Sequence, residues 1–184
     1  MDIWKVLLRR IKLGIFDPEY IFDSTVNISP EFLKSIGVKN VFLDVDNTLT
    51  THDNPVPAEG IEDWVRKMKD AGLNLIIISN NNEGRVAPFA ALLGLRYTYY
   101  SLKPLSKGFR EGWRITGGNS SDTIVIGDQI YTDVFGAHMA GMRAIMVIPI
   151  KEEDGISFRV RRKLEKKHLN RYLESNGKYM GKGE

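Results

Sequence analysis

Apolar and polar residues alternate in blocks through the middle of the chain, in the order typical of strands and helices in turn. Short apolar runs predict strands, and segments with apolar residues three and four positions apart predict helices. The expected strands are residues 41–43, 73–78, 97–100, 123–126 and 144–148. The expected helices are residues 31–36, 59–71, 85–93, 106–115 and 133–140. Strands 75–78 and 123–126 are continuously apolar, which indicates helices on both faces. We therefore expect an α/β fold, a doubly wound, Rossmann-like parallel sheet with five core strands.

The first residues of the chain have a different pattern. Residues 3–15 place apolar side chains at helical spacing, and basic side chains lie mostly on the opposite face. A basic amphipathic helix that carries a tryptophan, here Trp4, is typical of a segment lying in a membrane interface. A helix packed on the body of the protein and a transit sequence are the alternatives left open.

The pattern changes again after Pro149. Residues 158–173 are basic with interspersed apolar positions, which predicts either a basic amphipathic helix or a solvated helix covering part of the sheet. We expect the last residues, 177–184, to fray. The chain is therefore divided into 1–37, a basic helix and a connector; 38–150, an α/β domain; and 151–184, a basic C-terminal extension.

Charge is distributed unevenly between these segments. The net charge is +3, but residues 1–16 carry +3 and residues 156–184 carry +6, which leaves −6 on the rest of the chain. Basic ends on an acidic body favour an anionic partner, whether a membrane surface, nucleic acid or an acidic partner, unless the ends are merely solvated. Nucleic acid is not expected, because no aromatic and basic stacking platform is visible. The oligomeric state is not predicted.

Composition excludes several classes of chemistry and of location. Cysteine is absent, which excludes disulfides, thiol catalysis and cysteine-bound metals. No apolar run is long enough to cross a membrane, and no secretory signal is recognisable. The expected location is therefore cytoplasmic, with peripheral contact to an anionic membrane. It would be mitochondrial only if residues 3–15 were a transit sequence.

Polar side chains follow the expected strands at their carboxyl ends. Asp44 and Asp46 come directly after residues 41–43, and two like charges at a buried strand end repel each other unless a cation lies between them. The other strand ends supply Ser79, Asn80, Lys103, Asp128 and Asp133. In a doubly wound sheet these ends converge on one crevice. Carboxylates favour Mg²⁺, and lysine and hydroxyl groups suit phosphate oxygens, so this set predicts phosphoryl transfer.

These motifs resemble those of the haloacid-dehalogenase (HAD) superfamily of phosphohydrolases. The first motif is Asp44-Val45-Asp46-Asn47-Thr48-Leu49-Thr50, and the fourth is Gly127-Asp128-Gln129-Ile130-Tyr131-Thr132-Asp133. Ser79 and Lys103 match the second and third, and the resemblance covers residues 38–150. The phrases Ser79-Asn80-Asn81-Asn82-Glu83 and Lys103-Pro104 narrow the resemblance to subfamily IIIA, and within it to the YqeG-like phosphatases. That group is related to the mitochondrial phosphatidylglycerophosphate phosphatases.

The resemblance implies a HAD-like fold and a mechanism in two steps. Asp44 would attack phosphorus and form an aspartyl-phosphate. Asp46 would protonate the leaving oxygen and then take a proton from the hydrolytic water. The cofactor would be Mg²⁺, bound by the Asp44 carboxylate, the Asp46 backbone carbonyl and the Asp128 carboxylate. Lys103 would neutralise the phosphate and orient Asp44.

The remaining candidate residues would bind phosphate or support the metal site. Ser79, Asn80 and Thr48 are the candidates for binding phosphate, and Asp133 would support the metal or Lys103. From the sequence alone, Ser79 and Asp133 also suit helix N-caps, and Thr48 suits a turn. Arg85 is interpreted as a surface residue, with contact to a second anionic group of the substrate as the alternative.

The short connections leave no room for the cap domains that usually give HAD enzymes their specificity. Residues 50–59 form only a flap, and residues 79–103 hold one helix and one strand. An open site suits a bulky phosphate ester. Three hypotheses follow: a Mg²⁺-dependent phosphatase acting on phosphatidylglycerophosphate at a membrane surface; a soluble phosphatase for a small metabolite, a protein or a nucleic-acid end; and a non-catalytic module that docks an acidic partner or RNA.

Overall fold

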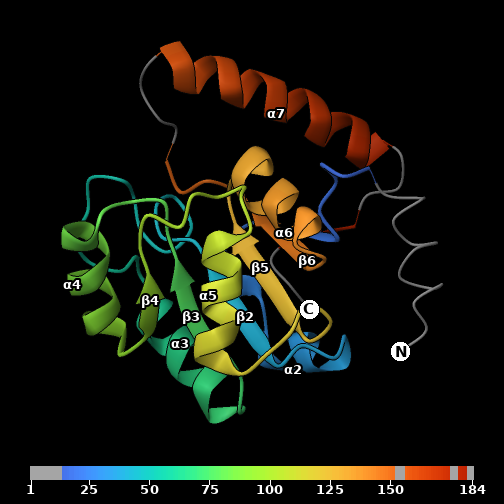
Figure 1. The fold of residues 1–184 in the computed structure, drawn as a ribbon. Coiled ribbons are helices and arrows are strands. Elements are labelled where there is room, and N and C mark those ends of the chain that lie inside the picture. Colours follow the sequence, from blue (N-terminus) through green and yellow to red (C-terminus); the bar gives the residue numbers. More distant parts are fainter. Residues whose placement is uncertain (1–13, 152–155, 175–177, 182–184) are drawn as a thin grey trace.

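The chain forms a single parallel sheet of seven strands with helices on both faces (Figure 1). The structure is a computed structural model that describes residues 14–151, 156–174 and 178–181. The strands are β1 (Tyr20–Phe22), β2 (Asn40–Leu43), β3 (Asn74–Ile78), β4 (Arg96–Thr98), β5 (Thr123–Gly127), β6 (Arg143–Val147) and β7 (Tyr179–Gly181). Their order across the sheet is β4-β3-β2-β5-β6-β1-β7. The expected α/β class with a doubly wound parallel sheet is confirmed.

Apart from the short η1 (Thr25–Asn27), which was not expected, the helical elements lie where the sequence predicts them, to within a few residues. The others are α2 (Pro30–Ser35), α3 (Ile61–Asp70), α4 (Glu83–Leu93), α5 (Lys107–Thr116), η2 (Ile130–Val134), α6 (Phe135–Met139) and α7 (Ile156–Glu174). The helix expected over 133–140 differs in kind, because it begins as the π-helical turn η2 and continues as α6. Single π-helical turns often occur at functional sites. This one directly follows β5.

The central strand β2 is buried on both sides and pairs with β3 and β5. Alternate residues of β2 enter two separate hydrophobic cores. Val41 and Leu43 pack with residues of α2, α3 and α4, whereas Phe42 packs with residues of α5, α6 and α7. In Figure 1, α5 and α6 lie in front of the sheet and α3 lies behind it. This burial on both faces explains why the strand sequences are continuously apolar.

Two strands were not expected. Residues 1–37 were expected to hold only a helix and a connector, but they supply β1, which pairs in parallel with β6 on one side and β7 on the other. Residues 177–184 were expected to fray, but Tyr179–Gly181 form β7. Each strand has three residues, too few to show a clear apolar period. Both flanking segments therefore add to the sheet, and the division of the chain at residues 37 and 150 remains a prediction.

No cap domain interrupts the sheet. The chain runs from β2 to α3 through loop residues 44–60, and from β3 to β4 through α4 alone. The amphipathic helix predicted over 3–15 falls mostly outside the described residues. Within the described parts of the chain, no helix is both long and apolar enough to cross a membrane.

Candidate active site

A buried lysine between two carboxylates forms the centre of the candidate site. The Lys103 Nζ atom lies 2.7 Å from Asp44 Oδ1 and 2.6 Å from Asp133 Oδ1. The side chains of all three residues are less than one-tenth exposed. Asp44 follows β2, Lys103 lies in the loop between β4 and α5, and Asp133 lies in η2. The carboxyl ends of the strands therefore bring these residues together, as the sequence predicts.

Burial and charge act in opposite directions on these groups. Burial raises the pKa of the Asp44 carboxyl to about 7; Lys103 opposes this shift, and Asp133 and Asp46 add to it. Burial acts to lower the pKa of Lys103, but the charges of Asp133 and Asp44 outweigh it and raise that pKa. Lys103 therefore stays charged at neutral pH, and two carboxylates share its one positive charge.

Asp128 adds a third carboxylate to this group. Oxygen atoms of Asp44, Asp128 and Asp133 all lie within 4.8 Å of one another, and all three residues are buried. Like charges this close and this poorly solvated repel strongly, and a divalent cation would remove the repulsion. Carboxylate oxygens are the ligands that Mg²⁺ prefers. The donor set therefore fits Mg²⁺, and the structure adds Asp133 to the carboxylates within reach of it.

The turn after β5 brings Asp133 back to the strand end. The Asp133 carboxylate accepts a hydrogen bond from the Gln129 backbone N–H at 3.2 Å. It also packs against Gly127, where an added Cβ would collide with the carboxylate. Gly127 therefore leaves the space that Asp133 occupies. Asp133 is not an N-cap, because it lies inside η2 rather than before it.

Asp46 lies apart from the acidic group and has its own partners. Its Oδ1 atom lies 3.0 Å from Arg85 Nη2 and 3.7 Å from His52 Nδ1. Its Oδ2 atom accepts a hydrogen bond from Asn81 Nδ2 at 3.2 Å. Asp46 is not among the three carboxylates whose oxygen atoms lie within 4.8 Å of one another, and metal binding through its backbone carbonyl remains a prediction.

Arg85 is the residue that sequence reasoning misjudged. Its side chain is only 17% exposed and also donates to the Thr51 carbonyl at 3.3 Å, so it is not a surface arginine. Asn82, the N-cap of α4, places Arg85 in the first turn of that helix. Its position directly after the second motif was the available signal, since the first turn of α4 faces the carboxyl ends of the strands.

The three candidate phosphate-binding residues differ in their surroundings. The Ser79 hydroxyl accepts a hydrogen bond from the Asn81 N–H at 3.1 Å. It is not the N-cap of α4, because that position belongs to Asn82. The Asn80 side chain accepts a hydrogen bond from the Lys103 N–H at 2.6 Å and donates one to the Lys103 carbonyl at 2.9 Å, so it fixes the loop that carries Lys103. The Thr48 hydroxyl is buried and has no hydrogen-bond partner among the described residues. Phosphate binding by these residues remains a prediction.

The metal-free protein is expected to lose stability between about pH 4 and pH 7 because of Asp44. Its folded pKa of about 7 lies above its ordinary value of 3.8. Below pH 3.8 Asp44 is protonated in both folded and unfolded states, and it adds no cost. Above pH 7 it is ionised in both, and the folded state carries the full cost, about 4 kcal/mol at about 1.4 kcal/mol per pKa unit.

The measurement compares the wild type with Asp44→Asn by urea unfolding in EDTA. The stability advantage of the variant should be small at pH 4, grow up to pH 8, and shrink when Mg²⁺ is added. An advantage that does not change with pH would contradict the raised pKa of Asp44.

The chain matches a known protein family over most of its length. Residues 12–141, well over half of the chain, match the family described as haloacid dehalogenase-like hydrolase. The chain belongs to the haloacid dehalogenase-like hydrolases. The family resemblance of its four motifs is therefore confirmed.

The relatives of this HAD chain include phosphatases. It is 37% identical over 155 residues to "Probable phosphatase YqeG" of Bacillus subtilis, covering 84% of this chain and 90% of the relative. It is 26% identical over 153 residues to the chloroplastic and mitochondrial "Phosphatidylglycerophosphate phosphatase 1" of Arabidopsis thaliana. That match covers 78% of this chain and only 44% of the plant protein. The protein is therefore an enzyme, a HAD-family phosphatase.

Solved structures agree on the fold. The cobalt-bound deoxy-D-mannose-octulosonate 8-phosphate phosphatase of Haemophilus influenzae aligns with a TM-score of 0.51 at 16% identity, covering 77% of this chain and 93% of that one. An uncharacterized protein of Listeria monocytogenes aligns with a TM-score of 0.53 at 16% identity, covering 64% of this chain and 85% of that one. At this identity the likeness concerns the HAD fold alone.

Proposed function

We propose that this protein is a Mg²⁺-dependent phosphomonoester hydrolase that acts through an aspartyl-phosphate on a bulky substrate at a membrane surface, such as phosphatidylglycerophosphate. The observation that carries the chemistry is the different surroundings of the two aspartates. Asp44 is buried against Lys103 with two further carboxylates nearby. Asp46 is held outside that group by Arg85 and Asn81. With Mg²⁺ bound beside it, Asp44 would be ionised and able to attack, and Asp46, held separately, would carry the proton.

In the first step a carboxylate oxygen of Asp44 bonds to phosphorus, and the bond from phosphorus to the ester oxygen breaks. Asp46 gives its proton to that leaving oxygen. In the second step water attacks phosphorus, Asp46 takes back a proton from the water, and inorganic phosphate leaves Asp44 free. Bound Mg²⁺ would supply positive charge that lets an anionic phosphate approach an anionic nucleophile. Lys103 adds charge on the same side and orients Asp44.

The rim of the site, formed by the exposed side chains of Leu102 and Leu105, suits a bulky, partly apolar substrate. The loop that carries the buried Lys103 exposes apolar side chains on both sides of it: Leu102 is 50% exposed and Leu105 is 63% exposed. With no cap domain, a phosphate attached to a large group can reach Asp44. A lipid headgroup fits this description better than a small metabolite, and one relative is a phosphatidylglycerophosphate phosphatase by name.

The test is phosphate release from a panel of esters, with and without Mg²⁺. The panel holds phosphatidylglycerophosphate in mixed micelles, glycerol 3-phosphate, a phosphopeptide and a 5′-phosphorylated oligonucleotide. We expect release only with Mg²⁺ and the highest kcat/KM for the lipid. A preference for one of the other esters would overturn the lipid assignment and leave the phosphatase in place. Equal release in EDTA would overturn the Mg²⁺ dependence.

A double variant tests the contribution of the rim to lipid binding. Changing Leu102 and Leu105 together to Ser should raise KM for the micellar lipid about thirtyfold or more and leave glycerol 3-phosphate hydrolysis unchanged, since each leucine that the lipid covers contributes on the order of 1–2 kcal/mol. Leu92→Ser is the matched control, because Leu92 is 55% exposed near the far end of α4. An unchanged KM for the lipid in the double variant would contradict contact between this loop and the lipid.

A further inference from the structure

The C-terminal helix α7 is packed over the catalytic edge of the sheet by one face. In Figure 1, α7 runs above α6, on the side where the strands end. The packed face includes Glu165, His168, Leu169 and Tyr172, which are spaced three and four residues apart. Leu164 and Leu173 are 49% and 40% exposed, so apolar residues alone do not define this face. A carboxylate in the packed face requires an explanation of its own.

Glu165 is 2% exposed and reaches the loop that carries Asp128. Its Oε1 atom accepts a hydrogen bond from the backbone N–H of Ile130 at 3.0 Å. Ile130 is the first residue of η2, two positions after Asp128. A hydrogen bond from a backbone N–H to a buried carboxylate is charge-assisted, and it is strong because little water competes for either group.

Two successive backbone N–H groups in the segment from Asp128 to Asp133 thus donate hydrogen bonds to carboxylates. Asp133 accepts from the Gln129 N–H, while its other oxygen binds Lys103. Glu165 accepts from the next N–H along the chain, that of Ile130. The first bond ties the loop to the buried lysine, and the second ties it to α7. Together they set where the Asp128 carboxylate can lie.

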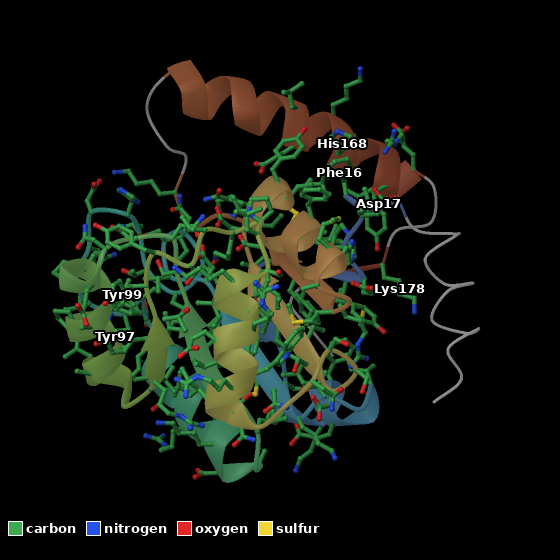
Figure 2. All side chains as sticks on the ribbon, viewed as in Figure 1. Phe16, Asp17, Tyr97, Tyr99, His168 and Lys178 are labelled. Carbon is green, nitrogen blue, oxygen red and sulfur yellow. The ribbon has the colours of Figure 1, made fainter. Side chains whose placement is uncertain are left out.

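Ring contacts one helical turn further along α7 keep Glu165 over this loop. The His168 ring lies 5.4 Å from the Phe16 ring and 6.0 Å from the Tyr131 ring, centre to centre. Phe16 also packs at 5.1 Å on Phe135 of α6. Figure 2 shows Phe16 and His168 side by side between α7 and α6. The position of Glu165 therefore depends on packing that includes residues from both flanking segments of the chain.

We propose that Glu165 is a positioning residue for the metal-binding carboxylate Asp128, so that the C-terminal helix is part of the catalytic apparatus. The inference rests on the proposed function, because it assumes that Asp128 binds the metal. It concerns a helix that lies outside the residues matched by the family, 12–141. The alternative is that Glu165 only satisfies a buried N–H and contributes stability alone.

The test compares Glu165→Ala and Glu165→Gln, with Glu174→Ala as the matched control. Glutamine keeps an oxygen that can accept from Ile130, whereas alanine does not. Glu174 is an exposed glutamate on the same helix. Hydrogen exchange of the peptide covering residues 128–134 reports on the loop. Calorimetric titration of the full chain with Mn²⁺, without substrate, reports on the metal site, and melting temperatures report on the fold.

Glu165→Ala should speed exchange in residues 128–134 and weaken Mn²⁺ binding about tenfold, the lower end of what loss of an outer-shell partner costs. Glu165→Gln should stay within about twofold of the wild type, and Glu174→Ala should match it. Unchanged Mn²⁺ affinity in a folded Glu165→Ala chain would overturn the inference, even if exchange or melting temperature changes. A wild-type chain that binds no Mn²⁺ would overturn both this inference and the proposed metal dependence. The titration of the unsubstituted chain therefore tells the failure of the proposed function apart from the failure of this inference alone.

Discussion

Asp44→Asn is expected to lower kcat for phosphate release roughly 10⁴-fold or more, because the amide cannot form the covalent bond to phosphorus. The side chain keeps nearly the same shape and keeps an oxygen that can face Lys103, so the fold should survive. In the metal-free protein the variant should even be more stable than the wild type at neutral pH, since burial raises the pKa of Asp44 to about 7. Loss of activity together with a gain in stability would separate a chemical role from a structural one.

Single-turnover measurement of phosphate release, with melting temperatures alongside, tests this expectation. Asp53→Asn is the control, because Asp53 is an aspartate in the flap after β2 whose side chain is 81% exposed. That variant should turn over at the wild-type rate. A rate within tenfold of the wild type for Asp44→Asn would refute its assignment as the nucleophile.

Lys103→Met is expected to cost both stability and activity. The substitution leaves Asp44 and Asp133 facing each other in a buried site without the ammonium that lies 2.7 and 2.6 Å from them. Removing one partner of a buried ionic group costs about 3–5 kcal/mol, because the remaining charge is uncompensated. The loss should be smaller at pH 5 than at pH 8, since Asp44, whose pKa burial already raises to about 7, can take up a proton at low pH.

Urea unfolding in EDTA at both pH values measures the effect. Lys107→Met serves as the control, because Lys107 is an exposed lysine four residues further along the chain. Its free energy of unfolding should stay within about 0.5 kcal/mol of the wild type. If Lys103→Met were equally mild, the two short ion pairs would contribute little to stability, and the role of Lys103 in this site would be chemical alone.

Sequence reasoning reached the fold and the residues of the site because both follow from local patterns. Strand β2 is apolar and ends in Asp44, and parallel strands place their carboxyl ends at one edge, so Lys103 and Asp128 were expected beside it. Arg85 was misjudged because its burial depends on Asp46, a partner 39 positions away in the chain. No periodicity reports such a pair.

The same limit applies to the two unexpected strands and to Glu165. β1 and β7 have three residues each and exist because β6 offers an unpaired edge to β1, and β1 offers one to β7. Glu165 belongs to a strongly basic helix, where a glutamate suggests an ordinary surface residue. Its burial follows from the packing of α7 on η2, a tertiary contact that the helix sequence does not encode by itself.

The position of β1 in the sheet has a consequence for how the chain folds during synthesis. β1 leaves the ribosome early, but its partners β6 and β7 are made more than a hundred residues later. Until then Tyr20–Phe22 have no strand to pair with, and pairing across so long a separation slows folding. The early strand is short and is flanked by Glu19 and Asp23, and charges of this kind discourage wrong pairing at an open strand edge. A nascent chain halted before residue 143 would therefore hold all four aspartates of the site, Asp44, Asp46, Asp128 and Asp133, and still lack β6, the strand with which β1 pairs.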